Sequence, residues 1–242
     1  MIEIVKATRD ELQTIHDMAQ VVFRHTYRDI LSPEQMEYMM DMMYSLPNLQ
    51  TQLDEGHHYY IAYMSPDQES STHQESSTHQ EDTSPHEDGA PCRCNDLASS
   101  DDSASAVCNP RDSILPVPCG YVSVQHEGPD QDGTEIFHLH KIYVMPEAQG
   151  RGVGLRLFQT VVQHVKSVLQ ARSAGDGASA IITPEVATAQ SATAKARIEL
   201  NVNKFNSAVN FYKHLGMRIL LEEDFPIGNG FYKTDYIMGL DV

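Results

Sequence analysis

The sequence predicts a mixed α/β fold, of the α+β type, with a mainly antiparallel sheet. Segments in which every second residue is apolar alternate with segments in which apolar residues recur every three or four positions, and these periods are typical of strands and helices. Two stretches, 65–118 and roughly 173–196, contain no aromatic residue and interrupt the pattern. With both set aside, about seven strands and their flanking helices remain, in a chain long enough for one large domain.

The N-terminal region begins with a strand at Ile2–Lys6, where apolar residues alternate. Thr8 and Glu11 follow with the spacing of a capping box, in which each side chain binds the backbone amide of the other residue. They predict a helix that runs to about His25.

A second helix is expected after Ser32, because Pro33 lacks the N–H group that is unpaired at the first position of a helix. Gly56 ends a third, short helix. The second half of the chain predicts strands at Ile136–Val144, Arg197–Val202, Met217–Glu222 and Phe231–Leu240, and helices at about Gly152–Gln170 and at Ser207–Leu215. Between two of these elements, we expect 173–196 to be a flexible loop rich in Ala, Ser and Thr.

The β-rich segments His58–Met64 and Gly120–Gln125 flank residues 65–118, which carry many acids and the hexapeptide Glu-Ser-Ser-Thr-His-Gln written twice. Such a composition cannot bury enough apolar surface to offset the entropy of ordering. We therefore expect 65–118 to be a disordered acidic insertion in a β-hairpin. Lengthening a turn from about 4 to about 54 residues costs only about 2 kcal/mol of closure entropy, so the fold can tolerate it.

The charge and the apolar content exclude several classes of protein. The chain has 17 basic and 34 acidic residues, and the net charge of −17 disfavours nucleic acid as a partner. It contains no run of about 18 apolar residues that could cross a membrane, and no secretory signal is visible. The four cysteines, three of them in the polar stretch, do not form a disulfide framework. We expect a soluble, cytoplasmic protein that binds neither nucleic acid nor membrane.

The chemistry concentrates in residues 149–154, Gln-Gly-Arg-Gly-Val-Gly, between a predicted strand and a predicted helix. Glycines leave backbone N–H groups open there, and the positive end of the helix dipole adds to them, so the segment suits a pyrophosphate. It lacks the Gly-Lys-Ser/Thr of the P-loop and the G-x-G-x-x-G spacing of dinucleotide-binding folds. The alternative is a tight turn that needs glycine only for its flexibility.

Two motifs resemble the GNAT superfamily of N-acetyltransferases. Residues 149–154 look like its Q/R-x-x-G-x-G/A motif, and the preceding Ile142–Pro146 looks like its fourth strand. Residues 201–217 are similar to its N-x-A-x-x-x-Y-x-x-x-G segment, and Asp235–Met238 resembles its last strand. The resemblance implies a GNAT-like fold with a splayed sheet, and a single N-acetyltransferase domain over residues 1–242.

The resemblance also implies acetyl-CoA as a co-substrate. The pyrophosphate would be held by the backbone amides of Gln149, Gly150, Arg151, Gly152, Val153 and Gly154. Main-chain groups of Ile142 and Val144, on either side of Tyr143, would pair with the pantetheine arm, and the Val144 amide would polarise the thioester carbonyl. Asn206 would form a hydrogen bond with the arm.

Tyr212 is the general acid that the resemblance implies for the leaving thiolate. A phenol with a pKa near 10 is protonated at pH 7 and can donate. The alternative is that Phe211 and Tyr212 only pack a helix against the sheet.

Acetyl transfer to an amine also needs a base, because an alkylammonium of pKa about 10.4 is neutral only about once in 2,500 molecules at pH 7. His138 and His140 share one face of a predicted strand, and a histidine pKa near 6.5 allows either to accept a proton. Related enzymes often have a carboxylate at the position of His140. We rank His140 first and His138 second; the alternative is that both are structural.

The acceptor pocket is expected at the first two helices, with Tyr27, His25 and Glu34 as candidate substrate-binding residues. The segment from Phe23 to Glu34 looks similar to that of bacterial spermine/spermidine acetyltransferases, so a polyamine is one candidate acceptor. For Glu34 the alternative is a solvated helix face. Four methionines at helical spacing are more typical of a core face than of a substrate channel: Met36, Met39, Met40 and Met43.

We predict direct transfer of acetyl from acetyl-CoA to a primary amine of a small molecule or a peptide, since no cysteine in the core motifs could carry the acetyl group. No metal is expected, because the spacing of Cys92, Cys94, Cys108 and His86 matches no closed tetrahedral site. A catalytically silent acyl-CoA sensor and an interaction protein that uses its acidic insertion remain alternatives. A homodimer also remains open.

Overall fold

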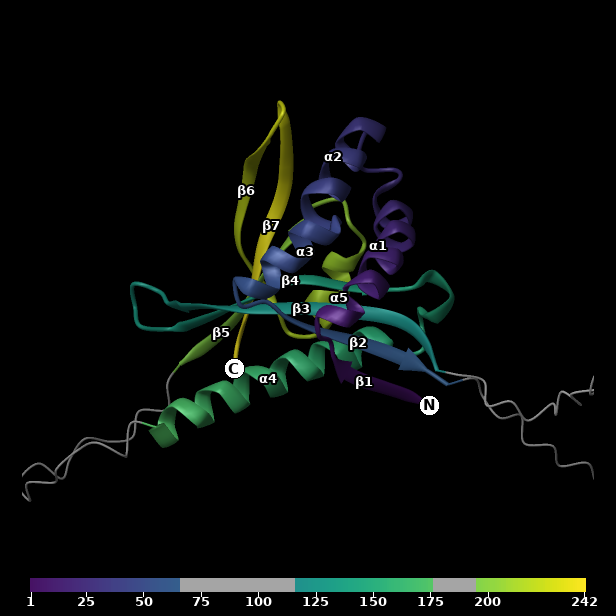
Figure 1. The fold of residues 1–242 in the computed structure, drawn as a ribbon. Helices are drawn as coiled ribbons and strands as arrows, with labels where there is room; N and C mark the ends of the chain where they lie inside the picture. Colours follow the sequence, from purple (N-terminus) through teal and green to yellow (C-terminus); the bar gives the residue numbers. More distant parts are fainter. Residues whose placement is uncertain (66–115, 176–194) are drawn as a thin grey trace, which may run out of the picture. The chain divides into compact units, whose positions relative to one another are not determined.

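The computed structural model describes residues 1–65, 116–175 and 195–242 (Figure 1). The predicted acidic insertion and the predicted Ala/Ser/Thr-rich loop lie almost wholly outside these residues. At their edges the described elements extend further than expected, because 117–118 and 196 belong to strands and 173–175 belong to a helix.

Seven strands form one sheet in the order β1-β2-β3-β4-β5-β7-β6. The strands are β1 (Ile2–Lys6), β2 (His58–Met64), β3 (Val117–Pro129), β4 (Glu135–Val144), β5 (Ala196–Asn203), β6 (Arg218–Gly228) and β7 (Phe231–Asp241). The α-helices are α1 (Leu12–Tyr27), α2 (Pro33–Tyr44), α3 (Leu46–Asp54), α4 (Val153–Gly175) and α5 (Ala208–His214). All neighbouring strands are antiparallel except β4 and β5, which confirms the predicted mixed, mainly antiparallel fold.

Local sequence signals set several element boundaries as predicted. Thr8 and Glu11 form the capping box, although the element that it caps is a short 3-10 helix that leads into α1. The hydroxyl of Ser32 caps α2, and Pro33 is its first residue. Gly56 follows α3 with a φ of 95°, a left-handed conformation that glycine adopts without strain.

The hairpin predicted around the insertion is present as a pair of antiparallel strands. His58 of β2 lies opposite Val124 of β3, and Met64 lies opposite Val117. The connection between the two strands falls outside the described residues.

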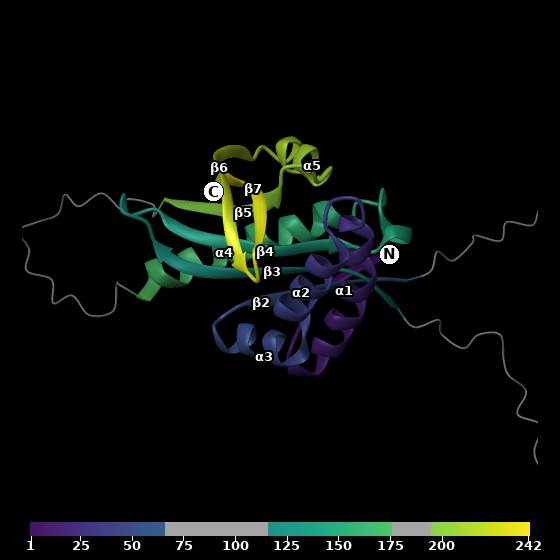
Figure 2. The ribbon, with the colours of Figure 1, turned by 90° about the horizontal axis from the view of Figure 1, so that it is seen from above.

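Helices cover both faces of the sheet (Figures 1 and 2). Helices α1, α2 and α3 pack on one face around Phe23, Tyr44 and Tyr121. Helix α4 crosses the other face, and its core includes Leu157 and Phe158. The methionine stripe of α2 is a core face, as predicted, because the side chains of Met36, Met39 and Met40 are buried. Among the described helices, none is long and apolar enough to cross a membrane.

The parallel pair β4 and β5 separates part of the way along. Residues Glu135–His138 pair with Ala196–Glu199, and the two strands then continue without pairing. A second irregularity lies just beyond, where Leu139 and Lys141 of β4 face consecutive residues of β3 and His140 is the extra residue of a bulge. We call the separation of β4 and β5 the split. The split and the bulge both lie near the two predicted motifs, residues 149–154 and 201–217.

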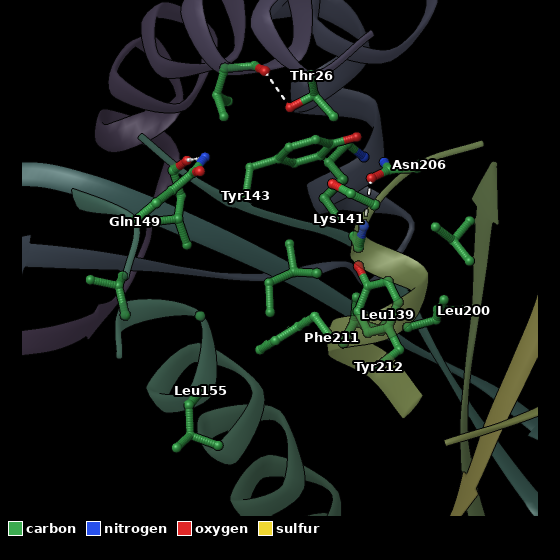
Figure 3. Close-up of a pocket in the computed structure, with 18 of the residues that line it drawn as sticks. Thr26, Leu139, Lys141, Tyr143, Gln149, Leu155, Leu200, Asn206, Phe211 and Tyr212 are labelled. Carbon is green, nitrogen blue, oxygen red and sulfur yellow. Dashed lines mark hydrogen bonds between the residues drawn. The ribbon is translucent and has the colours of Figure 1, made fainter. Parts of the chain in front are cut away.

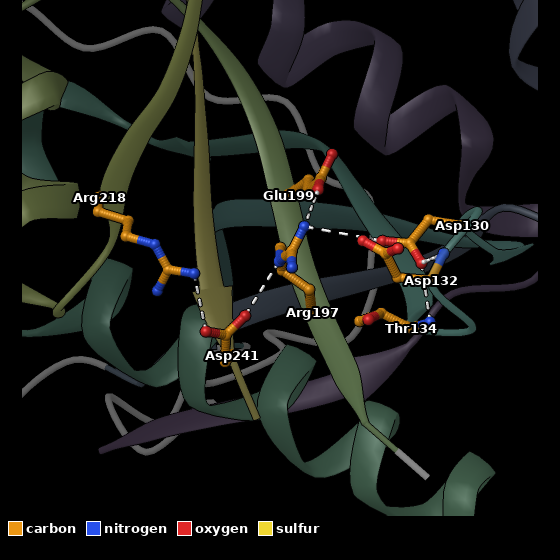
Figure 4. Close-up of polar contacts among 7 residues, drawn as sticks. All are labelled: Asp130, Asp132, Thr134, Arg197, Glu199, Arg218 and Asp241. Atoms are coloured by element: carbon orange, nitrogen blue, oxygen red, sulfur yellow. Dashed lines mark hydrogen bonds and ion pairs between the residues drawn. The ribbon is translucent and has the colours of Figure 1, made fainter.

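Ion pairs join the strands at the end where β4 and β5 remain paired (Figure 4). Arg197 of β5 contacts Asp241 of β7 at 3.0 Å and Glu199 at 3.3 Å, and lies 3.9 Å from Asp130. Arg218 of β6 holds the other oxygen of Asp241 at 2.8 Å. Among these ion pairs, only the one between Arg218 and Asp241 joins two exposed side chains, and such a pair contributes little stability. The Glu199 carboxylate is paired with Arg197.

Candidate active site

The turn between β4 and α4 leaves backbone donors open. Gly150 and Gly152 have φ angles of 73° and 80°, and a Cβ added at either position would meet no atom within 4 Å. In the part of the chain that the structure describes, the amides of residues 150–152 donate no hydrogen bond of the turn, loop or cap type to a backbone carbonyl. The first amides of α4 have no acceptor within the helix, and its dipole places positive potential at the same point. The turn is therefore suited to an anion.

The free edge of β4 faces the split between β4 and β5. The N–H group of Met145 donates to the carbonyl of Cys119 in β3 at 2.9 Å. Backbone groups of successive strand residues point to opposite edges, so those of Val144 and Ile142 point away from β3. The side chain of Gln149 donates to the Val144 carbonyl at 3.1 Å. Ile142 and Val144 thus direct main-chain groups into the split.

Helix α5 and the residues before it supply the opposite wall. The Asn206 Oδ1 atom accepts a hydrogen bond from the Ala208 amide at 2.9 Å. The Nδ2 atom of Asn206, which is a donor, takes no part in this bond. Tyr212 is 7% exposed, and its burial raises the pKa of the phenol above the usual value of 10. The hydroxyl therefore stays protonated at neutral pH. Figure 3 shows Tyr212 and Asn206 on one side of the view and Gln149 on the other.

A cavity of about 470 Å³ occupies the split. It extends from the glycine turn to Tyr212, between β4 and β5, and Asn206 lies on its wall (Figure 3). Of the residues predicted to bind the cofactor, it is lined by Ile142, Tyr143, Val144, Gln149, Gly150, Gly152, Val153, Gly154 and Asn206. Arg151 does not line it, because its side chain turns outward to the sulfur of Met64 at 3.4 Å. We call this space the cofactor cavity.

A second cavity, of about 440 Å³, adjoins the first and is called the acceptor cavity here. Helices α1 and α2, the bulged part of β4 and the strand β7 enclose it. The two cavities share Tyr27, His140, Lys141, Tyr143 and Asn201. Any group transferred between ligands in the two spaces would pass these five residues.

Three histidines stand in a row at the acceptor cavity. The ring of His140 lies 4.4 Å from that of His138 and 4.3 Å from that of His57, measured between centroids. His57 contacts the Ser123 hydroxyl through Nδ1 at 3.1 Å, and Nδ1 of His138 lies 3.6 Å from a carboxylate oxygen of Glu127.

The hydrogen bonds of Gln125 identify the free nitrogen of His140. The side-chain amide nitrogen of Gln125 donates to the Glu55 carbonyl at 2.8 Å, so its oxygen is the atom that faces His140 Nε2 at 3.0 Å. Nε2 must then carry the proton and donate, and Nδ1 keeps the lone pair.

Burial and neighbouring positive groups keep these histidines neutral. For His140, burial is the largest cause, followed by the charges of His138, His57 and Lys141. Together they lower the pKa of His140 to about 2. Burial, with Lys141 next, lowers the pKa of His57 to about 4. Burial also lowers the pKa of His138, against the opposing charge of Glu199.

Lys141 is a buried lysine at the junction of the two cavities. It is 4% exposed, its Nζ atom donates to Gln52 Oε1 at 2.6 Å, and it lies 5.7 Å from the ring centre of Tyr44 and 5.6 Å from that of Tyr59. Burial, with a smaller contribution from Lys233, lowers the pKa of Lys141 to about 7. The Lys141 ammonium therefore loses its proton far more readily than an ordinary lysine.

The structure brings most of the predicted catalytic and binding residues to these two cavities. Tyr212 lines the cofactor cavity, His138 lines the acceptor cavity, and His140 and Tyr27 line both. His25 and Glu34 line neither cavity. His25 is exposed and its ring contacts Arg28, and Glu34 is exposed at the first turn of α2.

Sequence reasoning did not find Lys141, Lys233, Asp235 or His57. Lys141 gave a weak signal, because it alternates with Phe137, Leu139 and Tyr143 on the more apolar face of its strand. The other three reach the cavity only through non-local strand pairing and packing. Among the described residues, no group of three or more His, Cys, Asp and Glu side chains could hold a metal ion.

Comparisons with known proteins find a family match over part of the chain. Residues 110–218 match the family model described as "Acetyltransferase (GNAT) domain". No curated protein matches the chain significantly.

Solved structures share the fold at low sequence identity. The PaiA N-acetyltransferase from Thermoplasma acidophilum, in complex with coenzyme A, is 16% identical, with a TM-score of 0.55 and coverage of 100% of this chain and 99% of that one. A GCN5-related N-acetyltransferase from Rhodopseudomonas palustris is 14% identical, with a TM-score of 0.53 and coverage of 99% and 95%. A GNAT-family acetyltransferase from Staphylococcus aureus is 13% identical, with a TM-score of 0.51 and coverage of 100% and 99%.

The family match over residues 110–218 and the fold shared with these structures both agree with a GNAT acetyltransferase domain. The matched family model describes an acetyltransferase domain, and one of the structures that share the fold was solved in complex with coenzyme A.

Proposed function

We propose that this protein transfers the acetyl group of acetyl-CoA directly to a primary amine of a small molecule or a peptide, with both substrates bound at once. The observation that supports this proposal most is the meeting of two cavities at His140, Lys141 and Tyr143. One cavity has the glycine turn and the other is lined by polar side chains, so each suits a different ligand. A silent acyl-CoA sensor would need only the first. An interaction role for the acidic insertion falls outside the described residues.

The cofactor cavity provides the parts that acetyl-CoA needs. The amides of Gln149 to Gly154, Arg151 and Val153 among them, would bind the pyrophosphate at the start of α4. The edge groups of Ile142 and Val144 would bind the pantetheine arm, together with Nδ2 of Asn206. The Val144 N–H group would polarise the thioester carbonyl, because it points into the split.

The reaction forms a C–N bond and breaks a C–S bond. The neutral amine attacks the thioester carbonyl, and the tetrahedral adduct collapses with loss of the thiolate. Tyr212 donates its phenolic proton to that thiolate, and its burial supports this role because it keeps the phenol protonated.

His140 takes the proton that the amine loses, through Nδ1. With a pKa of about 2 in the empty site, His140 is a weak acceptor for a proton from a free alkylammonium. The role that fits it better is to take the proton from the tetrahedral adduct, because the protonated nitrogen of that adduct is more acidic than a free alkylammonium. His138, 4.4 Å away between ring centres, is second in rank as the base.

The acceptor is less well defined than the donor. Tyr27 is placed to contact it, since it lines both cavities. A polyamine is the least favoured of the predicted acceptors, because the charged residues of the acceptor cavity are Lys141, Lys233 and Asp235. Two lysines against one aspartate do not favour a polycation.

The proposal is tested by free-thiol release from saturating acetyl-CoA with a panel of amines and peptides. Turnover with at least one primary amine, lost in Tyr212→Phe, is the expected result. Binding of acetyl-CoA without thiol release on any amine would favour the silent sensor and overturn the proposal.

A further inference from the structure

The charges of the acceptor cavity contrast with those of the whole chain. The protein has a net charge of −17, yet among the described residues this cavity is lined by Lys141 and Lys233 against the carboxylate of Asp235 alone. Its three histidines add no negative charge. The nearby Glu199 carboxylate is held by Arg197 at 3.3 Å. A cavity with positive charge in a strongly acidic protein points to a ligand with a negative group.

Lys233 and Asp235 both face the cavity from β7. They are two residues apart, so they lie on the same face of the strand at a separation of about 6.8 Å along it. Neither belongs to an ion pair with another described side chain, and Asp235 is only 5% exposed. Burial raises the pKa of Asp235, and the Lys233 ammonium opposes this shift. A ligand that carries both signs would bring an ammonium to Asp235, which favours its charged form, and would give Lys233 an anion to bind.

The order of the two charges gives the ligand a direction. Asp235 pairs in register with Asn203 of β5, two residues from Asn201, which lines both cavities. Along the backbone of β7, Asp235 therefore lies nearer the junction with the cofactor cavity, and its carboxylate acts on Tyr27, which lines both cavities. Lys233 follows two positions away, opposite Phe225 in the β6–β7 hairpin, and its ammonium acts on Lys141 and His138. An ammonium would lie at the inner position and an anion at the outer one.

We propose that the acceptor is a small aminocarboxylate, with its ammonium directed to Asp235 and the junction and its carboxylate bound by Lys233. This inference rests on the proposed function and names the substrate class of the same site. A cavity of about 440 Å³ has room for a molecule of amino-acid to dipeptide size. The substrate specificity then resides in Lys233, which does not take part in the chemical step.

The test compares three acceptors of equal chain length under saturating acetyl-CoA: 4-aminobutanoate, its primary amide and 1,4-diaminobutane. A second set based on an α-amino acid and its amide covers the shorter separation of charges. We expect kcat/KM, measured by thiol release, to be about 10- to 100-fold higher for the carboxylate than for the amide, as for a hydrogen bond to a charged group. The diamine should be the poorest of the three.

Lys233→Glu should invert the order, so that the diamine becomes better than the carboxylate. Lys166→Glu is the matched control, because Lys166 is an exposed residue of α4 on the other face of the sheet, and the wild-type order should persist. The wild-type comparison needs no variant, so a misfolded Lys233→Glu protein would not hide the answer.

The two proposals fail in different ways. Thiol release that is equal for carboxylate and amide in both sets, or greatest for the diamine, would overturn the aminocarboxylate assignment and leave acetyl transfer intact. Acetyl-CoA binding with no thiol release for any amine would overturn the proposed function and this inference with it.

Discussion

The side-chain oxygen of Gln125 lies 3.0 Å from Nε2 of His140, and this contact determines which imidazole nitrogen is free. Gln125 is itself oriented by its donation to the Glu55 carbonyl. His140 therefore presents Nδ1 as its lone-pair nitrogen at the junction of the two cavities. The positioning of the proposed base thus depends on a glutamine of the neighbouring strand β3.

The pH dependence of activity should not come from His140. Because its pKa is lowered to about 2, His140 is neutral throughout the range from pH 5 to pH 9. We predict that His140→Ala lowers kcat by about 10²- to 10⁴-fold without moving an acidic limb of kcat/KM in that range. Acceptors of different pKa distinguish the limb of the amine from that of the protein. If His140→Ala removes a limb near pH 6.5 that does not move with the acceptor, His140 titrates normally and this assignment is wrong.

Tyr212→Phe should separate the chemical role of the phenol from its packing. The variant loses only the hydroxyl, so we expect little change in melting temperature and a fall in kcat of about 10²- to 10⁴-fold. Phe211→Leu is the companion variant, since Phe211 also lines the cofactor cavity but carries no proton donor. Full kcat in Tyr212→Phe, with chemistry rate-limiting, would remove Tyr212 as the acid.

Lys141 should make the stability of the protein depend on pH above neutrality. Its folded pKa of about 7 is below the unfolded value near 10.5, so between these values the unfolded state binds a proton that the folded state does not. Stability should therefore rise with pH in this window, by up to about 1.4 kcal/mol per pH unit, and the destabilisation by charged Lys141 is complete below pH 7.

Lys141→Met removes this group and serves as the comparison. We predict that the difference in unfolding free energy between wild type and Lys141→Met changes in favour of wild type from pH 7 to pH 10, in urea titrations at several pH values. A difference that does not depend on pH would show that Lys141 keeps an ordinary pKa in the folded protein.

The fold of the sheet should not depend on residues 66–115. Strands β2 and β3 pair from His58–Val124 to Met64–Val117, so their ends are already side by side. We propose that 1–242 is a single domain interrupted by this segment. Replacing 66–115 with a short turn should leave the melting temperature and the acetyl-CoA affinity unchanged. Loss of folded protein would mean that the segment contributes to the domain.

Local features of the sequence predicted most of the fold. The capping box at Thr8, the proline after Ser32 and the glycines at 150 and 152 each act within a few residues, so their outcome can be worked out from the chain alone. The bulge at His140 and the separation of β4 from β5 after His138 depend on which strands pair and in which register.

The acceptor site was predicted less well for the same reason. His25 and Glu34 are on the right helices, but their side chains lie outside the cavity. Lys233 and Asp235 reach it because β7 pairs with β5 across a large separation in sequence. Lys141 is likewise buried by residues of three elements, Tyr44 of α2, Gln52 of α3 and Tyr59 of β2. No local sequence pattern reveals that these elements meet there.

Binding of acetyl-CoA at the glycine turn is the claim on which the rest depends, and calorimetric titration of three proteins tests it most directly. Gly152→Asp places a carboxylate at the proposed pyrophosphate site, and Gly230→Asp is the matched control, since Gly230 has a φ of 76° and equally open space at the tip of the β6–β7 hairpin. Both variants carry the same strain and the same added charge. We predict that wild type and Gly230→Asp bind acetyl-CoA alike, and that Gly152→Asp loses at least tenfold in affinity. Equal affinity in all three proteins would contradict the account.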